Sequence, residues 1–99
     1  MLQVFAATYG ASVLTRIDPD QVRARLRTWR NARGLTQEQL ADRSGLEVKH
    51  IQDLESGRKG FNPTLLTLDA LAAALEVDVM QFLFAPEQLL TMLERSIQS

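Results

Sequence analysis

The feature that most restricts the fold is a pair of short helical segments on either side of one glycine. Thr36 and Gln39 stand at the spacing of a capping box, which predicts that a helix begins after Thr36. Leu35 and Leu40 flank this start at the spacing of a hydrophobic staple. Gly45 favours a left-handed helix end, because glycine has no Cβ to clash in that conformation. The first helix is therefore short.

A second short helix follows that glycine. Leu46 and Ile51 repeat the staple spacing around Glu47, so this helix is expected to begin there and to end at Gly57. Two short helices joined by a turn that contains glycine are typical of a helix-turn-helix motif.

The same signals predict helices on both sides of the motif. Before it, Asp18 as N-cap and Pro19 at the first helical position open a helix that Gly34 closes. After it, one helix follows Thr64 and another opens at Asp78. The inward side chains expected for the helix after Thr64 are Leu65, Leu68, Leu71, Ala72 and Leu75.

These elements predict an all-α chain with one five-helix domain over residues 18–84. A C-terminal helix within residues 85–99 places Leu89, Leu90, Leu93 and Ile97 on one side. That stripe either packs back on the domain or forms a dimer face, and we favour the dimer face because the five helices already close a core. Residues 1–17 form an extension that fits a β-hairpin, a short helix over 11–17, or a segment without regular structure.

Composition excludes several classes of protein. With no cysteine and one histidine, the chain offers neither a disulfide scaffold, a zinc cluster nor a Ser-His-Asp triad. We expect no cofactor, no metal and no enzymatic activity, and His50 is interpreted as an ordinary helix residue. The apolar runs are far shorter than the ~20 residues that span a bilayer, and the first residues lack the positive region of a signal peptide. A soluble, cytoplasmic protein without a membrane partner is expected.

The formal net charge of −1 conceals an uneven distribution. Residues 20–59 hold nine basic and six acidic side chains, whereas residues 60–99 hold one basic and five acidic side chains. A basic half joined to an acidic half is typical of a protein that turns one face to a polyanion, although two ordinary solvated surfaces fit equally well.

The segment from Val22 to Leu83 resembles the DNA-binding domain of the Xre/Cro-repressor family. The resemblance rests on the run Leu35–Leu46, on Ile51, on Leu54–Gly57 and on the pattern that begins at Pro63. It covers about two-thirds of the chain and implies a lambda-repressor-like helix-turn-helix fold. It also implies that the second helix of the motif is a recognition helix that enters the DNA major groove.

The resemblance assigns roles to particular residues. Base contacts fall on Val48, Lys49, Gln52 and Asp53, and phosphate contacts on Thr36, Gln37, Arg58 and Lys59. Arg30 and Glu55 match a structural ion pair of the family. Glu47 stands where the family usually has Ser or Thr, and Asp53 where Arg, Gln or Lys is commoner.

The sequence thus predicts a homodimeric, sequence-specific regulator that binds double-stranded DNA, a repressor of a palindromic operator. One alternative is the antitoxin of a toxin–antitoxin pair, in which the extension and the C-terminal stripe bind a protein toxin. Another is a protein-binding module that no longer binds DNA, for which Glu47 and Asp53 are the motivation.

Overall fold

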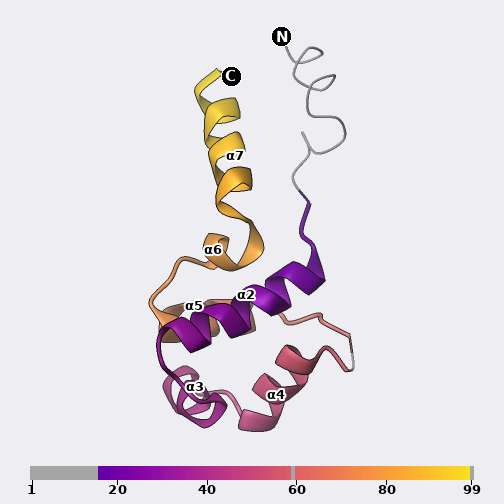
Figure 1. The fold of residues 1–99 in the computed structure, drawn as a ribbon, viewed down its shortest axis with the longest axis vertical. Coiled ribbons are helices and arrows are strands. Elements are labelled where there is room, and N and C mark those ends of the chain that lie inside the picture. The colour runs from indigo at the N-terminus through magenta and orange to yellow at the C-terminus, as the bar shows by residue number, and fades with distance from the viewer. Residues whose placement is uncertain (1–15, 59, 99) are drawn as a thin grey trace.

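The computed structural model describes residues 16–58 and 60–98, and over this range the chain is helical with no named strand. The helices in chain order are α2 (Pro19–Ala32), α3 (Gln37–Ser44), α4 (Val48–Ser56), α5 (Leu65–Leu75), α6 (Val79–Leu83) and α7 (Pro86–Gln98). Helices α2 to α6 form a body from which α7 extends (Figure 1). The predicted all-α fold is confirmed, whereas the expectations for residues 1–15, including the β-hairpin, lie outside the described residues.

The ends of the helices follow the sequence signals. Both bonds of the capping box are present at the start of α3, from the amide of Gln39 to Thr36 Oγ1 at 3.0 Å and from the amide of Thr36 to Gln39 Oε1 at 2.8 Å. Gly45 ends α3 with a φ of 76°, and its amide donates to the carbonyl of Ala41 at 2.9 Å. A side chain at Gly45 would be strained by this backbone conformation, which explains why glycine suits the turn into α4.

The core lies between α2 on one side and α3, α4 and α5 on the other, with α6 closing one end. Helix α2 packs against α4 and α6, while α3 packs against α4 and α5. The most deeply buried side chains are Val22, Leu26, Leu40, Ile51, Leu71, Leu75 and Phe82. Ala41 is also buried, at 8% exposure, where α3 packs closely on its neighbours.

Arginines of α2 and its C-cap bind the C-terminal ends of three other helices. Arg23, Arg25 and Arg33 donate to backbone carbonyls at 3.3, 2.9 and 2.8 Å. The acceptors are, in that order, Glu55 in α4, Phe82 in α6 and Leu75 in α5. Carbonyls in the last turn of a helix lack intrahelical partners and carry partial negative charge, so a guanidinium group is a favourable ligand. The arginines of α2 and its C-cap therefore hold the ends of α4, α5 and α6 against α2.

The structure corrects one predicted core position. Leu65 is 79% exposed, and its neighbour Leu66 is 82% exposed. Leu65 is the first residue of α5, where the helical spacing continues but no neighbouring helix covers it. The other predicted inward positions of α5 are buried.

Helix α7 leaves a row of apolar side chains in solvent. Leu90 and Leu93 are each 56% exposed, and Ile97 is 75% exposed. In Figure 1 the helix extends upward from α6 and away from α3 and α4. Neither α7 nor any other helix within residues 16–58 and 60–98 is both long and apolar enough to cross a membrane.

Phe82 is predicted to hold α6 on α2. Its side chain is 1% exposed, whereas Met80 on the same short helix is 40% exposed. We expect Phe82→Ala to lower the free energy of unfolding by about 3–5 kcal/mol, because the substitution leaves a cavity in the core where the phenyl ring is buried. Met80→Ala, the matched control, should change it by about 0.5 kcal/mol or less. Urea denaturation followed by circular dichroism measures the free energy of unfolding of both variants. Equal losses would show that Phe82 does not hold α6 against α2.

Candidate nucleic-acid interface

Helix α4 buries one face and presents the other to solvent. Ile51, Leu54 and Glu55 are buried, with Ile51 at 0% exposure. Lys49 and Gln52 are exposed on the opposite side of the helix. This helix can therefore offer polar side chains to a ligand without losing its packing.

A nearly buried ion pair fixes α4 against α2. Arg30 Nε lies 2.6 Å from Glu55 Oε2, and Arg30 Nη2 lies 2.9 Å from Glu55 Oε1, a two-pronged arrangement. The side chains are only 12% and 5% exposed. The hydrogen bond to Glu55 raises the pKa of Arg30 above its ordinary value although burial opposes this. Arg30 Nη1 also donates to the carbonyl of Leu35 at 2.7 Å, just before α3.

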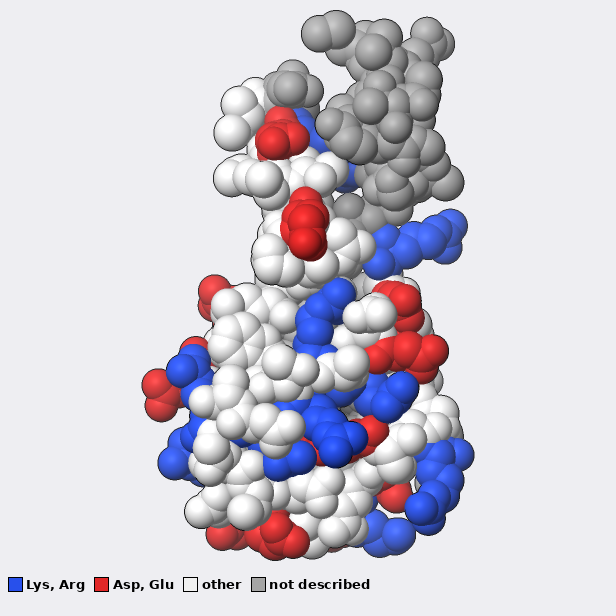
Figure 2. Space-filling model, viewed as in Figure 1, with Lys and Arg blue, Asp and Glu red and all other residues white. Residues whose placement is uncertain are grey.

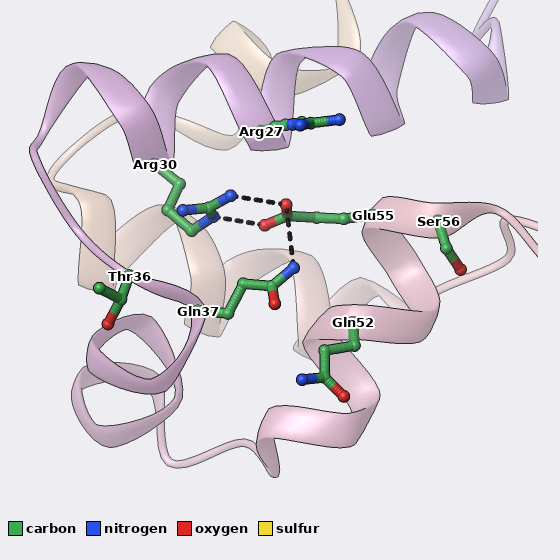
Figure 3. A pocket seen from close by; sticks show the side chains of 7 residues that line it. All are labelled: Arg27, Arg30, Thr36, Gln37, Gln52, Glu55 and Ser56. Atoms are coloured by element: carbon green, nitrogen blue, oxygen red, sulfur yellow. Dashed lines mark hydrogen bonds and ion pairs between the residues drawn. The ribbon is translucent and has the colours of Figure 1, made fainter.

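Gln37 extends this network to α3. Its Nε2 donates to Glu55 Oε1 at 3.3 Å, so one carboxylate accepts hydrogen bonds from α2 and from α3 (Figure 3). The network joins three helices at the point where α3 begins. It also orients the Gln37 amide, the side chain to which the resemblance assigns a phosphate contact.

These residues line a polar cleft of about 510 Å³ between α2, α3 and α4. Its lining is Arg27, Arg30, Thr36, Gln37, Gln52, Glu55 and Ser56. Figure 3 shows Gln37 and Gln52 on the same side of the cleft, from α3 and α4, with Arg27 opposite on α2. Arg27 is exposed and makes no hydrogen bond or ion pair with another described residue. The cleft therefore combines a helix N-terminus with a cation that has no partner among the described residues, a combination that suits an anion.

Arg27 and Ser56 are the lining residues that the site predictions from sequence left out, and Arg27 is the charged one. The signal for Arg27 is its position three residues before Arg30 on α2, which places both on one side of the helix. Arg23, four residues before Arg27, falls on the same side but contacts the end of α4, so helical spacing alone does not single out Arg27.

The remaining predicted base contacts lie on or near the exposed face of α4. Lys49 Nζ is 4.0 Å from Asp53 Oδ1, one helical turn away. Val48 is half-buried and packs against the core, so only part of its side chain faces solvent. Glu47 is the N-cap of α4 but makes no side-chain hydrogen bond to the helix, as expected where an acid with a longer side chain replaces Ser or Thr.

Of the two predicted cations after α4, the structure describes one. Arg58 is exposed and follows the helix end at Gly57. Lys59 lies outside the described residues. Within the described part of the chain, no three histidine, aspartate or glutamate side chains gather in a way that suits a metal ion.

Positive charge gathers over α2. Figure 2 shows Lys and Arg side chains crowded across the middle of the visible face, where Figure 1 places α2. The part of this face that belongs to α7 is mostly uncharged or acidic (Figure 2).

A sequence model of the helix-turn-helix family matches residues 26–82, which include α3, α4 and the buried ion pair. The chain belongs to this family. The family resemblance predicted from the sequence is confirmed, because the similar proteins include a phage immunity repressor and two controller proteins.

Two relatives and two solved structures illustrate the similarity. The chain is 42% identical over 55 residues to the immunity repressor protein of Bacillus phage phi105, and 47% identical over 58 residues to the control protein C.SmaI of Serratia marcescens. These matches cover 56% and 59% of this chain, and 37% and 67% of the relatives. The controller protein C.AhdI of Aeromonas hydrophila matches in structure with a TM-score of 0.60 and 35% identity, over 66% of this chain and 96% of that one. The hypothetical transcription factor NHTF from Neisseria matches with a TM-score of 0.62 and 34% identity, over 76% and 85% of the two chains.

The buried ion pair is predicted to show strong thermodynamic coupling. Arg30→Met or Glu55→Leu alone should lower the free energy of unfolding by about 3–5 kcal/mol, because each leaves one charge buried without its partner. The double variant should lose less than the sum of the two, since it buries neither charge. Arg43→Met, which removes an exposed cation of α3, is the control and should have almost no effect. Urea denaturation of all four variants measures the coupling, and additive losses would contradict it.

Proposed function

We propose that this protein is a sequence-specific DNA-binding regulator of transcription that acts in the cytoplasm as a dimeric repressor. One observation supports this most: the exposed face of α4 lies beside a polar cleft whose three helices are held by the Arg30–Glu55 pair. An α-helix fits the major groove, and a helix-turn-helix protein inserts its second helix there while the first contacts the backbone.

In this proposal the exposed side chains of α4 contact base edges. Lys49 donates to O6 and N7 of guanine, and Gln52 pairs with adenine through both atoms of its amide. The exposed part of Val48 contacts a thymine methyl group. Asp53 also faces the bases.

The cleft contacts the phosphate backbone. Gln37 and Thr36 lie at the start of α3, where backbone amides point outward and favour an anion. Arg27 is exposed on the other wall of the cleft and adds a cation. Arg58 and Lys59 contact the backbone beyond the end of α4. These contacts set the orientation of the protein on DNA without reading sequence.

Dimerisation supplies the affinity that one short helix lacks. Two copies related by a two-fold axis read half-sites about 34 Å apart, so the operator is an approximate palindrome. We assign the contact to the apolar face of α7, where Leu90, Leu93 and Ile97 are exposed and the helix extends from a body that is closed without it.

The base and phosphate roles predict different patterns of loss. Lys49→Ala and Gln52→Ala should each weaken binding to a selected operator by about 1–3 kcal/mol and have a smaller effect on random duplex. Gln37→Ala and Arg27→Ala should weaken binding to both duplexes alike, and Arg27→Ala should reduce the salt dependence by about one counterion. Fluorescence anisotropy at several salt concentrations measures all of them.

The control for these variants is Gln21→Ala, an exposed glutamine in the first turn of α2. It should bind both duplexes like the parent protein. If a variant that lacks both Lys49 and Gln52 keeps the full sequence preference, the assignment of α4 as the recognition helix is wrong.

The dimer assignment is tested by exposed leucines on two different helices. Leu90→Ser/Leu93→Ser should raise the dimer dissociation constant ~1,000-fold or more. A fully buried leucine contributes about 1.5 to 3 kcal/mol, each of these two is 56% exposed in the single chain, and the dimer holds four of them. Leu65→Ser/Leu66→Ser, the matched control on α5, should leave the dimer intact. Sedimentation equilibrium measures the constants, and dissociation by the α5 variant alone would move the interface from α7 to α5.

A further inference from the structure

The centre of the exposed face of α4 holds two opposite charges. Successive residues of a helix are rotated by about 100°, which places Lys49 and Asp53 on the side opposite Ile51 and Leu54. Lys49 Nζ and Asp53 Oδ1 are 4.0 Å apart, and the side chains are 74% and 29% exposed. If α4 enters the major groove, as the proposed function requires, this pair lies on the side of the helix that faces the bases.

A carboxylate at that place needs a reason. Asp53 faces a surface lined with phosphates, where an unbalanced negative charge weakens binding. The ion pair with Lys49 adds only a few tenths of a kcal/mol to stability, because the Lys49 side chain is 74% exposed. What the pair does provide is a hydrogen-bond donor and an acceptor side by side.

The pattern of groups on a G·C base pair matches this arrangement. Across the major groove, guanine presents the acceptors N7 and O6, and cytosine then presents the N4 amino donor. Lys49 fits the guanine acceptors while Asp53 accepts from cytosine N4. On an A·T pair the only amino donor lies between two acceptors, N7 of adenine and O4 of thymine. A carboxylate there would lie against a second oxygen, so the same pair of side chains disfavours A·T.

We propose that Lys49 and Asp53 act as one unit that reads a single G·C base pair in each half-site, and that Asp53 is the specificity-determining member. The proposal rests on the proposed function. Asp53 accepts from the cytosine of the base pair whose guanine Lys49 contacts, and it holds Lys49 away from neighbouring phosphates. Pairing with Asp53 thereby makes the contact of Lys49 with DNA depend on the base pair that it meets.

The first experiment selects duplexes from a random pool with the parent protein, Lys49→Ala and Asp53→Ala. The parent should enrich G·C at one position of each half-site, by about 10- to 100-fold over A·T. Both variants should lose the preference at that same position. Gln52→Ala, the matched control on the same helix, should keep the G·C preference at that position and lose sequence preference at a different position.

The second experiment removes single groups from the DNA. A selected duplex in which 2-pyrimidinone replaces the cytosine lacks the N4 amino group. The parent protein should bind this duplex about tenfold more weakly than the unmodified one. Asp53→Ala should lose less affinity on the same replacement, because it has no carboxylate to contact the amino group. Inosine in place of the guanine keeps O6 and N7 and loses only a minor-groove amino group, so it should bind like guanine.

Three results would overturn the proposal. The variants Lys49→Ala and Asp53→Ala could lose preference at different positions, or Asp53→Ala could bind every duplex more tightly and select an unchanged sequence. The parent protein and Asp53→Ala could also lose the same factor in affinity when the N4 amino group is removed from the duplex. In each of these cases the parent protein still selects a DNA sequence, so the proposed function stands. If the parent protein enriched no sequence at all, both the proposed function and the proposal for Lys49 and Asp53 would be wrong.

Discussion

The ion pair between Arg30 and Glu55 is the interaction on which the interface depends. Helix α4 is nine residues long, too short to be stable alone, and its N-cap residue makes no side-chain bond to it. What orients it is a carboxylate near its end, held by two guanidinium bonds from α2 and by the amide of Gln37 from α3. The same group that fixes the exposed face of α4 therefore also sets the side chain at the start of α3. The proposed base contacts on α4 and the proposed phosphate contact of Gln37 therefore depend on the same carboxylate.

Several arginines of α2 and its C-cap have a structural role in this chain, whose net charge is −1. Arg23, Arg25 and Arg33 donate to carbonyls at the ends of other helices, so their guanidinium groups are held in place by the fold. Arg27 faces the cleft with no described partner. Under the proposed function, a net charge of −1 predicts weak electrostatic binding to DNA of any sequence. The proposal therefore assigns selective binding to base contacts and to dimerisation.

Local signals in the sequence predicted the helices, and tertiary contacts explain what they missed. Capping residues such as Thr36 and Gln39 act within one turn, so the start of α3 could be predicted without knowledge of its neighbours. The end of α5 has no such signal, because Glu76 adopts a left-handed φ of 58° without being glycine. The exposure of Leu65 and the place of Arg27 in the cleft depend on where other helices lie, which periodicity does not specify.

The central claim is that α4, held by Arg30 and Glu55, is the surface that meets DNA. Its most direct test is titration of the ¹⁵N-labelled protein with a duplex that carries the selected half-sites, followed by amide chemical shifts. The claim predicts large shifts at the start of α3 and along α4, including Gln37, Lys49 and Gln52, and small shifts over most of α5. Shifts concentrated on α5 or on the acidic residues of α7, with α4 unchanged, would contradict it.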